Sequence, residues 1–302
     1  MKTKPKNIQH KFSRVVVLES LEENEVKTGK EAYKLIKGIF EEEKIQTPID
    51  HFQFPNAIEF RKIIKSLTEI ANTKDIPLIH IDCHGDIKDG LIFENGSSID
   101  WPELAELITP INKATNFQLI LCLSACNAAE FLGQMGAITR PCPCRLLVAP
   151  DTVIKPSELL SGFRRFYSNL FNTRSLGDAV ESLKELNSIE VTWTGEFAET
   201  WFSYLTQSHV LKNWSGTGIR RKAANFQKYA AEKGKLITIK EAKKQVLHYV
   251  RNEEFNLMYS NYFGIKENPA VNEMFDYINL EFKTWVNKMH TENKCVIYFP
   301  NI

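Results

Sequence analysis

The sequence predicts an α/β protein with a mostly parallel β-sheet, helices on both faces of that sheet, and a mainly helical C-terminal extension. Three observations predict this class. Short runs of β-branched and aliphatic residues alternate with segments of helical periodicity through roughly the first 188 residues. Two runs are apolar at nearly every position, which is typical of parallel strands buried on both faces. Beyond that part, helical and aromatic-rich patterns replace the alternation.

The first elements follow this alternation in chain order. Residues 15–19 (VVVLE) are a β-branched run typical of a buried strand. Helical spacing of apolar residues follows over 28–44, with Thr28 expected to open a capping box. Residues 49–54 alternate between apolar and polar and predict a second strand, after which Asn56 is expected to cap another helix.

The next strand leads into the first chemically interesting segment. Residues 77–82 (PLIHID) predict a third strand that runs directly into Cys83-His84-Gly85. A hairpin is expected over 91–99, with Asn95-Gly96 as its turn, because this dipeptide favours the backbone of tight hairpin turns.

A capped helix and the most hydrophobic strand come next. Asp100 is expected to cap a helix over 101–112. Residues 117–123 (FQLILCL) predict a buried strand that ends at Ser124-Ala125-Cys126. A short helix is expected after it, then a strand over 145–149 and helices over 157–171 and 175–186.

The change of pattern near residue 189 divides the chain into an expected α/β domain, 1–188, and a mainly helical extension, 189–302. Within the extension, Thr238 begins a second capping box and Asn268-Pro269 has the cap-then-proline signal of a helix start. Residues 295–299 (CVIYF) predict one last strand.

Composition excludes several classes of protein. The formal net charge is only +1, so the overall composition does not indicate a protein that binds polyanions with its whole surface. No segment reaches the roughly 18–20 apolar residues of a membrane span. The start MKTKPKNIQHKFSR is basic but lacks the apolar core of a signal peptide. We therefore expect a cytoplasmic protein.

The cysteines favour buried thiols or a nucleophile. Without an export signal, a disulfide framework is not expected. A metal site is also not expected, because Cys142 and Cys144 lack the usual spacing and a second close pair. A nucleophilic cysteine needs a partner base. The six cysteines are Cys83, Cys122, Cys126, Cys142, Cys144 and Cys295.

His84 and Cys126 each follow a predicted buried strand, and ligands of parallel sheets bind beyond the carboxyl ends of the strands. Their separation accommodates a hairpin, a helix and a strand, so we expect a crossover that brings the two strand ends side by side or nearly so. Gly85 permits close backbone approach, and the amides of Gly85 and Cys126 are the expected oxyanion donors. The alternative is that both side chains are simply buried at strand ends. Cys83 is expected to face away from His84 and belong to the core.

The blocks IHIDCHGD and LILCLSACNA resemble the His-Gly and Ser-Ala-Cys blocks of caspase-like cysteine peptidases, and are most similar to the bacterial CHAT branch. The segments DGLIFENGSSIDWPEL and LLVAPDTVIKPSELLSGFRRFYSNLFNTRSLGDAVESL also resemble that branch, so the likeness covers about residues 14–187. The resemblance implies a caspase-like fold, with Cys126 as nucleophile and His84 as its partner, and no cofactor or metal. It departs from caspases at Ser124, where they carry glutamine, so their substrate preference is not carried over.

The resemblance also implies a protein substrate and strong selection of the side chain before the cut. An acidic pocket would select a basic residue, and the acidic candidates at the carboxyl edge of the sheet are Asp151 and Glu19. Asp151 as a plain turn residue is the alternative. Relatives of this kind imply a regulated role in bacterial antiviral defence or cell death.

A function of a different class stays open: an inactive caspase-like fold that binds a protein or nucleic acid. Residues 212–244 are rich in Lys and Arg and contain only two acidic residues, Glu232 and Glu241. Phe226 and Tyr229 lie among the basic residues. Such a stretch can bind phosphates. It can equally form the solvated faces of two helices.

Overall fold

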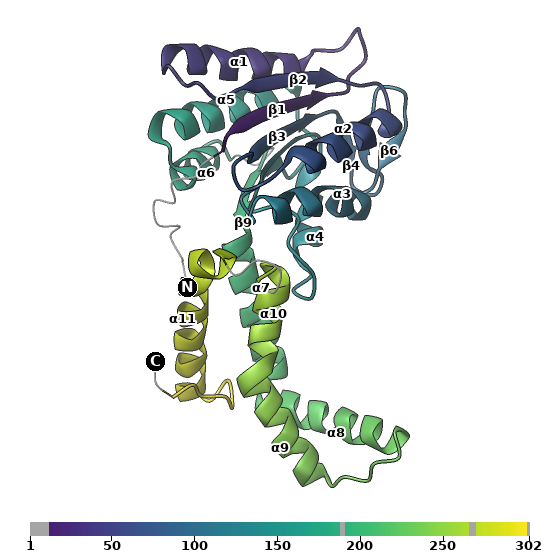
Figure 1. Ribbon diagram of the computed structural model, residues 1–302, viewed down its shortest axis with the longest axis vertical. Helices are drawn as coiled ribbons and strands as arrows, with labels where there is room; N and C mark the ends of the chain where they lie inside the picture. The colour runs from purple at the N-terminus through teal and green to yellow at the C-terminus, as the bar shows by residue number, and fades with distance from the viewer. Residues whose placement is uncertain (1–11, 188–190, 266–269, 301–302) are drawn as a thin grey trace. The chain divides into compact units, whose positions relative to one another are not determined.

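The computed structural model describes residues 12–187, 191–265 and 270–300 (Figure 1). The chain divides into two compact units. The sheet unit comprises the residues up to Met135 together with Cys142–Ala198. The helical unit comprises Gly136–Pro141 together with the residues from Glu199 onward.

The sheet unit contains a six-stranded sheet with the order β2-β1-β3-β7-β8-β9. Its neighbouring strands are parallel, except that β9 runs antiparallel to β8. This arrangement confirms the predicted fold class. The strands are β1 (Arg14–Glu19), β2 (Ile49–Gln53), β3 (Pro77–Asp82), β7 (Ile120–Ser124), β8 (Leu146–Pro150) and β9 (Trp193–Phe197).

Helices cover both faces of this sheet, as Figure 1 shows. On one face, apolar residues of β1, β3, β7 and β8 share a core with α1 (Thr28–Glu42), α5 (Pro156–Thr173) and α6 (Leu176–Lys184). On the other face lie α2 (Ala57–Ile70) and α3 (Trp101–Ala114), which pack against each other. The four central strands are therefore buried on both sides, which explains their continuous apolar runs.

A small antiparallel sheet follows β3 directly. It consists of β4 (His84–Asp86), β5 (Gly90–Ile92) and β6 (Ser98–Ile99). The predicted hairpin is confirmed, and Gly96 in its turn has a φ of +80°, which glycine adopts readily. After β7 the chain forms the short helices η1 (Ala128–Phe131) and α4 (Leu132–Met135).

Most predicted helix caps are confirmed. Asn56 accepts hydrogen bonds from the backbone N–H groups of Ile58 and Glu59, and Asp100 accepts one from Glu103. The capping box that begins at Thr238 is also present. These caps are predictable because each bond joins residues two or three positions apart.

The predicted cap at Thr28 is wrong. The N-cap of α1 is Lys27, and Thr28 is the first helical residue. Its hydroxyl donates to both carboxylate oxygens of Asp82, at 2.9 and 2.7 Å, and so leaves the local capping position. The side chain of Glu19 accepts the Lys30 N–H at 2.9 Å, so a distant carboxylate satisfies one of the open donors at the start of α1.

Two further predictions differ from the structure. The part expected to be mainly helical contributes strand β9, which pairs with β8 along the sheet edge. Residues 295–299 form no strand, because Ile297 turns into the core and the Phe299 N–H bonds to the side chain of Asn287. The helix start predicted at Asn268-Pro269 lies outside the described residues.

The helical unit is built around aromatic side chains. Phe202, Trp214, Tyr262 and Phe263 are fully buried in it. No helix in the described part of the chain is long and apolar enough to cross a membrane. The elements are α7 (Ala198–Asn213), α8 (Gly216–Glu232), α9 (Ile239–Tyr249), a π-helical turn η2 (Val250–Glu254), α10 (Phe255–Tyr262) and α11 (Ala270–Thr291).

A buried carboxylate ties three of these elements together. Glu254 accepts the indole N–H of Trp214 at 2.8 Å, contacts His209 at 3.2 Å and pairs with Lys222. Burial by itself raises the pKa of Glu254, but the bonds from His209 and Lys222 outweigh it and bring the pKa to about 2. The polar partners make this buried charge tolerable in an aromatic core.

Candidate active site

The two predicted catalytic residues leave the sheet on neighbouring strands. β3 and β7 are parallel and adjacent, with Asp82 paired to Ser124 at their carboxyl ends. The Cys83 N–H continues the pairing and donates to the Ser124 carbonyl at 3.3 Å. His84 and Cys126 each lie two residues beyond that last pair. The expected crossover and the adjacency of the two strand ends are therefore confirmed.

Gly85 packs its backbone directly against Cys126. A Cβ built on Gly85 would lie 2.2 Å from the Cys126 carbonyl oxygen, 3.1 Å from the Cys126 nitrogen and 3.0 Å from the Ala125 Cβ. The first of these distances excludes any side chain without a backbone shift. Glycine is therefore required here by close approach, and the approach places the segment after His84 against Cys126.

A buried hydrogen-bonded cluster, which we call the clamp, joins Asp82, Ser124 and Thr28 at the strand ends before His84 and Cys126. The Ser124 hydroxyl donates to Asp82, whose side chain also accepts the Thr28 hydroxyl. Burial raises the pKa of Asp82 to about 7, even though the hydrogen bonds from Ser124 and Thr28 oppose this. The clamp joins the strand ends that carry His84 and Cys126. The signal in the sequence is a polar residue at the end of each apolar strand, two positions before each predicted catalytic residue.

Cys126 differs in exposure from the other thiols. It is partly exposed, whereas the other five cysteines are buried. Burial raises the pKa of the Cys122 thiol to about 12 and that of Cys83 well above its ordinary value. A thiol reacts as its thiolate, so burial makes these two unsuitable as nucleophiles. The buried cysteines are Cys83, Cys122, Cys142, Cys144 and Cys295.

The Cys126 thiol and the His84 imidazole have separate contacts in this structure. The Cys126 Sγ lies 3.8 Å from the carbonyl oxygen of Ile154. The His84 Nε2 lies 2.9 Å from the Glu25 Oε1, with 51% of the His84 side chain exposed. No hydrogen bond joins Cys126 to His84 among the described residues. Catalytic hydrogen bonds often tighten only when substrate binds.

His80, on the same strand as the site, has a structural role. Its Nδ1 lies 2.8 Å from the Tyr167 hydroxyl, and its ring packs edge-on against Phe163. Burial lowers the pKa of His80 to about 3, so the ring is neutral over the physiological range. Exposure therefore distinguishes His84 from this second histidine only 4 residues before it.

Asp151 lies at the edge of the site. It is exposed, directly follows β8, and accepts a hydrogen bond from the Thr194 hydroxyl. The carbonyl of the next residue, Thr152, accepts the N–H of Asn127 at 3.1 Å. This bond ties the loop that carries Asp151 to the residue that follows Cys126, and the Asp151 carboxylate stays open to solvent.

Glu19 has a different environment. Its carboxylate is buried and takes hydrogen bonds from the Lys30 N–H at 2.9 Å and the Gln53 side chain at 3.0 Å, with His51 at 3.3 Å. Burial by itself raises the pKa of Glu19, but these contacts outweigh it and bring the pKa to about 2. Two strands separate β1 from β8, which places Glu19 roughly 14 Å from Asp151 along the edge. The structure does not bring the two acidic candidates together.

Metal ligands do not gather in the described residues, where no group of three or more His, Cys, Asp or Glu side chains is arranged to hold an ion. Cys142 and Cys144 are buried, and the Cys142 Sγ lies 3.1 Å from the Cys144 carbonyl oxygen.

No protein-family model and no curated protein matches this chain. The resemblance to caspase-like peptidases therefore stays a prediction, and the geometry of the site is the basis for the function proposed below.

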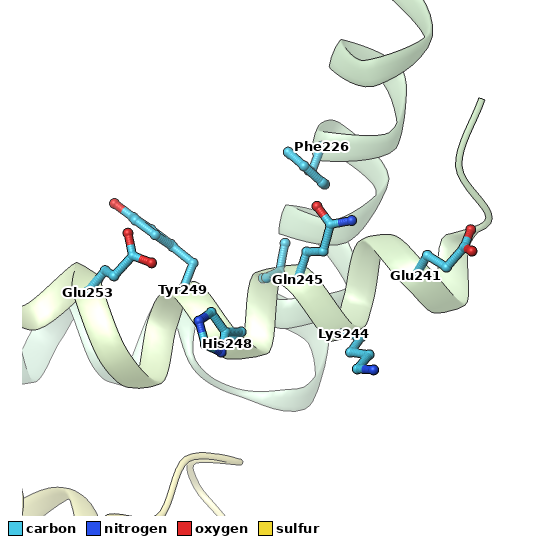
Figure 2. A pocket seen from close by; sticks show the side chains of 8 residues that line it. Phe226, Glu241, Lys244, Gln245, His248, Tyr249 and Glu253 are labelled. Carbon is cyan, nitrogen blue, oxygen red and sulfur yellow. The ribbon is translucent and has the colours of Figure 1, made fainter. Parts of the chain in front are cut away.

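The helical unit holds a separate cavity of about 770 Å³. Figure 2 shows Phe226 of α8 opposite Gln245 of α9, with Tyr249 and Glu253 further along the chain. Most of its lining is contributed by α9, with Glu253 near the end of the π-helical turn. It is concave, no cysteine is among its lining residues, and its two carboxylates, Glu241 and Glu253, lie at opposite ends of the lining segment (Figure 2).

The two helices that contribute to this cavity are rich in exposed basic residues. Eight Lys and Arg side chains between Gly216 and Tyr249 are exposed, against the two exposed carboxylates of Glu232 and Glu241. None of the eight forms an ion pair with an acidic residue in the described part of the chain. We name this set the α8–α9 basic surface: Arg220, Arg221, Lys228, Lys233, Lys235, Lys240, Lys243 and Lys244.

Proposed function

We propose that this chain is a cysteine endopeptidase of the caspase-like kind. One observation carries the proposal: two register-matched strand ends bring a half-exposed imidazole, His84, and a partly exposed thiol, Cys126, to one edge of the sheet. Gly85 packs against Cys126 at that point. A base, a thiol and closely packed backbone amides are the groups that thiol-dependent amide cleavage needs.

The proposed reaction begins with transfer of the Cys126 thiol proton to His84. This transfer requires the thiol to turn from Ile154 toward the imidazole. The thiolate attacks the carbonyl carbon of the peptide bond, and the amides of Gly85 and Cys126 donate to the oxyanion. His84 then gives its proton to the leaving amine, which leaves a thioester on Cys126. Water, deprotonated by His84, hydrolyses the thioester and restores the thiol. These steps need no metal or organic cofactor.

We propose that the residue before the cut is basic. The exposed Asp151 carboxylate, tied through its loop to the residue after Cys126, supports this preference. Glu19 is left out, because its carboxylate is buried and already hydrogen-bonded. Fluorogenic peptides that differ only at this residue test it. Preference for Arg and Lys is expected, and preference for Asp or small apolar side chains would contradict it.

The substrate is proposed to be an unstructured segment of a partner protein. The resemblance to the CHAT branch supports a regulated role in bacterial antiviral defence or cell death, in the cytoplasm. A regulated peptidase of this kind would show low activity until an activating partner binds.

Cleavage of a mixed-peptide library by the full chain tests the peptidase proposal. Wild type, Cys126→Ala and Cys83→Ala are compared, since Cys83 is the buried thiol nearest in sequence to His84. We expect cleavage by wild type and Cys83→Ala and none by Cys126→Ala. Cleavage that survives in Cys126→Ala would exclude Cys126 as the nucleophile.

A second candidate function is an inactive caspase-like fold that binds a polyanion, with nucleic acid as the partner. The specific observation in its favour is the α8–α9 basic surface, whose eight cations lack acidic partners among the described residues. Exposed Tyr229 on the same helix pair could stack on bases. Selective labelling of Cys126 by a peptide-based electrophile favours the peptidase, because a binding module has no need of an activated thiol.

A further inference from the structure

Glu25 contacts the predicted catalytic histidine from a loop that sequence reasoning did not connect with the site. The Glu25 Oε1 lies 2.9 Å from the His84 Nε2, and 30% of the Glu25 side chain is exposed. Glu25 lies between β1 and α1, so the contact joins a loop on one side of β3 to the residue that follows β3.

The loop holds the Glu25 carboxylate in a defined place. Its other oxygen, Oε2, accepts the Glu22 N–H at 2.7 Å, and the Glu25 N–H donates to the Glu22 carbonyl at 3.0 Å. The loop is also tied to β3, because the Ser20 N–H donates to the Asp82 carbonyl at 2.8 Å. A carboxylate whose backbone and second oxygen are both engaged can orient a neighbouring ring at low entropic cost.

This contact determines which imidazole nitrogen serves the thiol. With the Nε2–H donated to Glu25, the neutral ring keeps its lone pair on Nδ1. Among the described residues, Nδ1 has no hydrogen-bond partner, so its lone pair is available to accept a proton. When the ring takes the thiol proton at Nδ1, the Glu25 carboxylate lies against the resulting positive charge.

We propose that Glu25 is the positioning residue of the site, a third member that orients His84 and favours its charged form during the reaction. The inference rests on the proposed peptidase function for its catalytic consequence. The orientation itself can be measured without any substrate.

The test uses the full chain with Glu25→Ala, Glu25→Gln and, as the matched control, Glu23→Gln, an exposed carboxylate of the same loop. Two quantities are measured. The first is the order of the His84 ring, from NMR relaxation of ¹³C-labelled histidine, assigned with His84→Gln. The second is the separate kcat and KM on the best fluorogenic peptide.

In Glu25→Ala we expect the His84 ring to become mobile and kcat to fall by at least roughly 10- to 100-fold, the loss seen when a metal-binding histidine loses the group that orients it. KM should stay within about two-fold, because Glu25 orients His84 and binds no substrate. Glu25→Gln keeps the acceptor oxygen and should restore ring order but only part of kcat. Glu23→Gln should match wild type.

The two proposals fail in different ways. An equally ordered His84 ring in Glu25→Ala overturns the role of Glu25, whatever the activity. A mobile ring in Glu25→Ala supports that role. If wild type also cleaves no peptide, the peptidase proposal fails but the role of Glu25 in orienting His84 stands. Unchanged kcat in Glu25→Ala, in an active wild-type background, also overturns it.

Discussion

At the residue scale, a few side chains at the carboxyl edge of the sheet decide what the site can do. Gly85 permits the close approach to Cys126, and exposure distinguishes Cys126 from the buried thiols. Asp82 and Ser124 join the two strand ends beneath the site. Sequence reasoning reached Gly85 and Cys126 through their strand-end positions. It missed Asp82 and Ser124, because polar strand ends are common and only the pairing of β3 with β7 shows their contact.

We predict that Gly85→Ala removes most of the activity and also lowers the stability of the fold by about 1–3 kcal/mol, because the clash is with backbone. The new methyl group would lie 2.2 Å from the Cys126 carbonyl oxygen and displace that backbone. Loss of one oxyanion donor lowers kcat by roughly 100- to 1,000-fold. Peptide cleavage and thermal unfolding are measured together.

The control for that variant is Gly133→Ala, since a Cβ at Gly133 meets nothing within 4 Å. It should keep wild-type cleavage. Full activity in Gly85→Ala would contradict the close packing against Cys126.

We predict that Asp82 makes stability fall as pH rises. Its pKa is raised from 3.8 to about 7 by burial, so between about pH 4 and 7 the folded protein holds a proton that the unfolded chain has lost. Its contribution to stability is therefore fully present below about pH 4 and decreases as pH rises to about 7. Each pKa unit corresponds to about 1.4 kcal/mol. Urea unfolding of wild type and Asp82→Asn at pH 5 and 7.5 measures the change in unfolding free energy of each protein with pH.

The expected result is that wild type loses stability relative to Asp82→Asn between these two pH values. His80 contributes in the opposite direction, because its pKa is lowered to about 3, but it is present in both proteins and cancels in the difference. A difference that does not change with pH would show that Asp82 is ionised in the folded state.

At the element scale, local signals and distant contacts compete for the same groups. Asn56 caps α2 through bonds within three residues, as predicted. Thr28 has an equally good local pattern, but its hydroxyl donates to Asp82 of β3 instead. A cap would use the Thr28 oxygen as an acceptor, whereas the bond to Asp82 uses its O–H as a donor; packing against the end of β3 makes Thr28 the first residue of the helix. The start of α1 is thereby fixed over the ends of β1 and β3.

We predict that Gly162→Ala destabilises the sheet unit. A Cβ at Gly162 in α5 would lie 2.0 Å from the Trp193 ring of β9, so the helix or the edge strand must move. Overpacking of this kind costs about 1–3 kcal/mol. Chemical denaturation measures the loss.

The matched control is Gly38→Ala in α1, where a Cβ meets nothing within 4 Å. It should stabilise the protein by about 0.5–1 kcal/mol through helix propensity. Equal effects of the two substitutions would contradict the packing of α5 against β9.

At the scale of the whole molecule, charge is nearly balanced but unevenly distributed. The net charge is +1, while the α8–α9 basic surface gathers eight exposed cations. Any attraction to a polyanion is therefore expected at these two helices, and the net charge of the whole chain gives no indication of it.

We predict that the full chain binds single-stranded RNA in a salt-dependent way through this surface. The triple variant Lys240→Gln, Lys243→Gln, Lys244→Gln should weaken binding. The slope of log K against log salt should become shallower by about one for each lysine that no longer neutralises a phosphate. Fluorescence anisotropy at several salt concentrations measures both the affinity for RNA and the salt slope.

The control carries Lys37→Gln, Lys65→Gln and Lys74→Gln, three exposed lysines of the sheet unit. It should bind as wild type does. Equal weakening by both triple variants would show a non-specific charge effect.

The sequence by itself determined the alternation of strands and helices, most of the caps, and the strand-end positions of His84, Gly85 and Cys126. These follow from hydrophobic periodicity and from bonds between residues a few positions apart, both of which are visible along the chain. The strand β9 carries a weaker pattern and was missed for that reason.

Only the tertiary structure decided the burial of Glu19, the clamp between Asp82 and Ser124, and the contact of Glu25 with His84. Each joins residues that are far apart in the chain. Such contacts depend on strand order and register, which place β1, β3 and β7 next to one another. The order of strands in the sheet is set by packing of the whole core, and no local pattern encodes it.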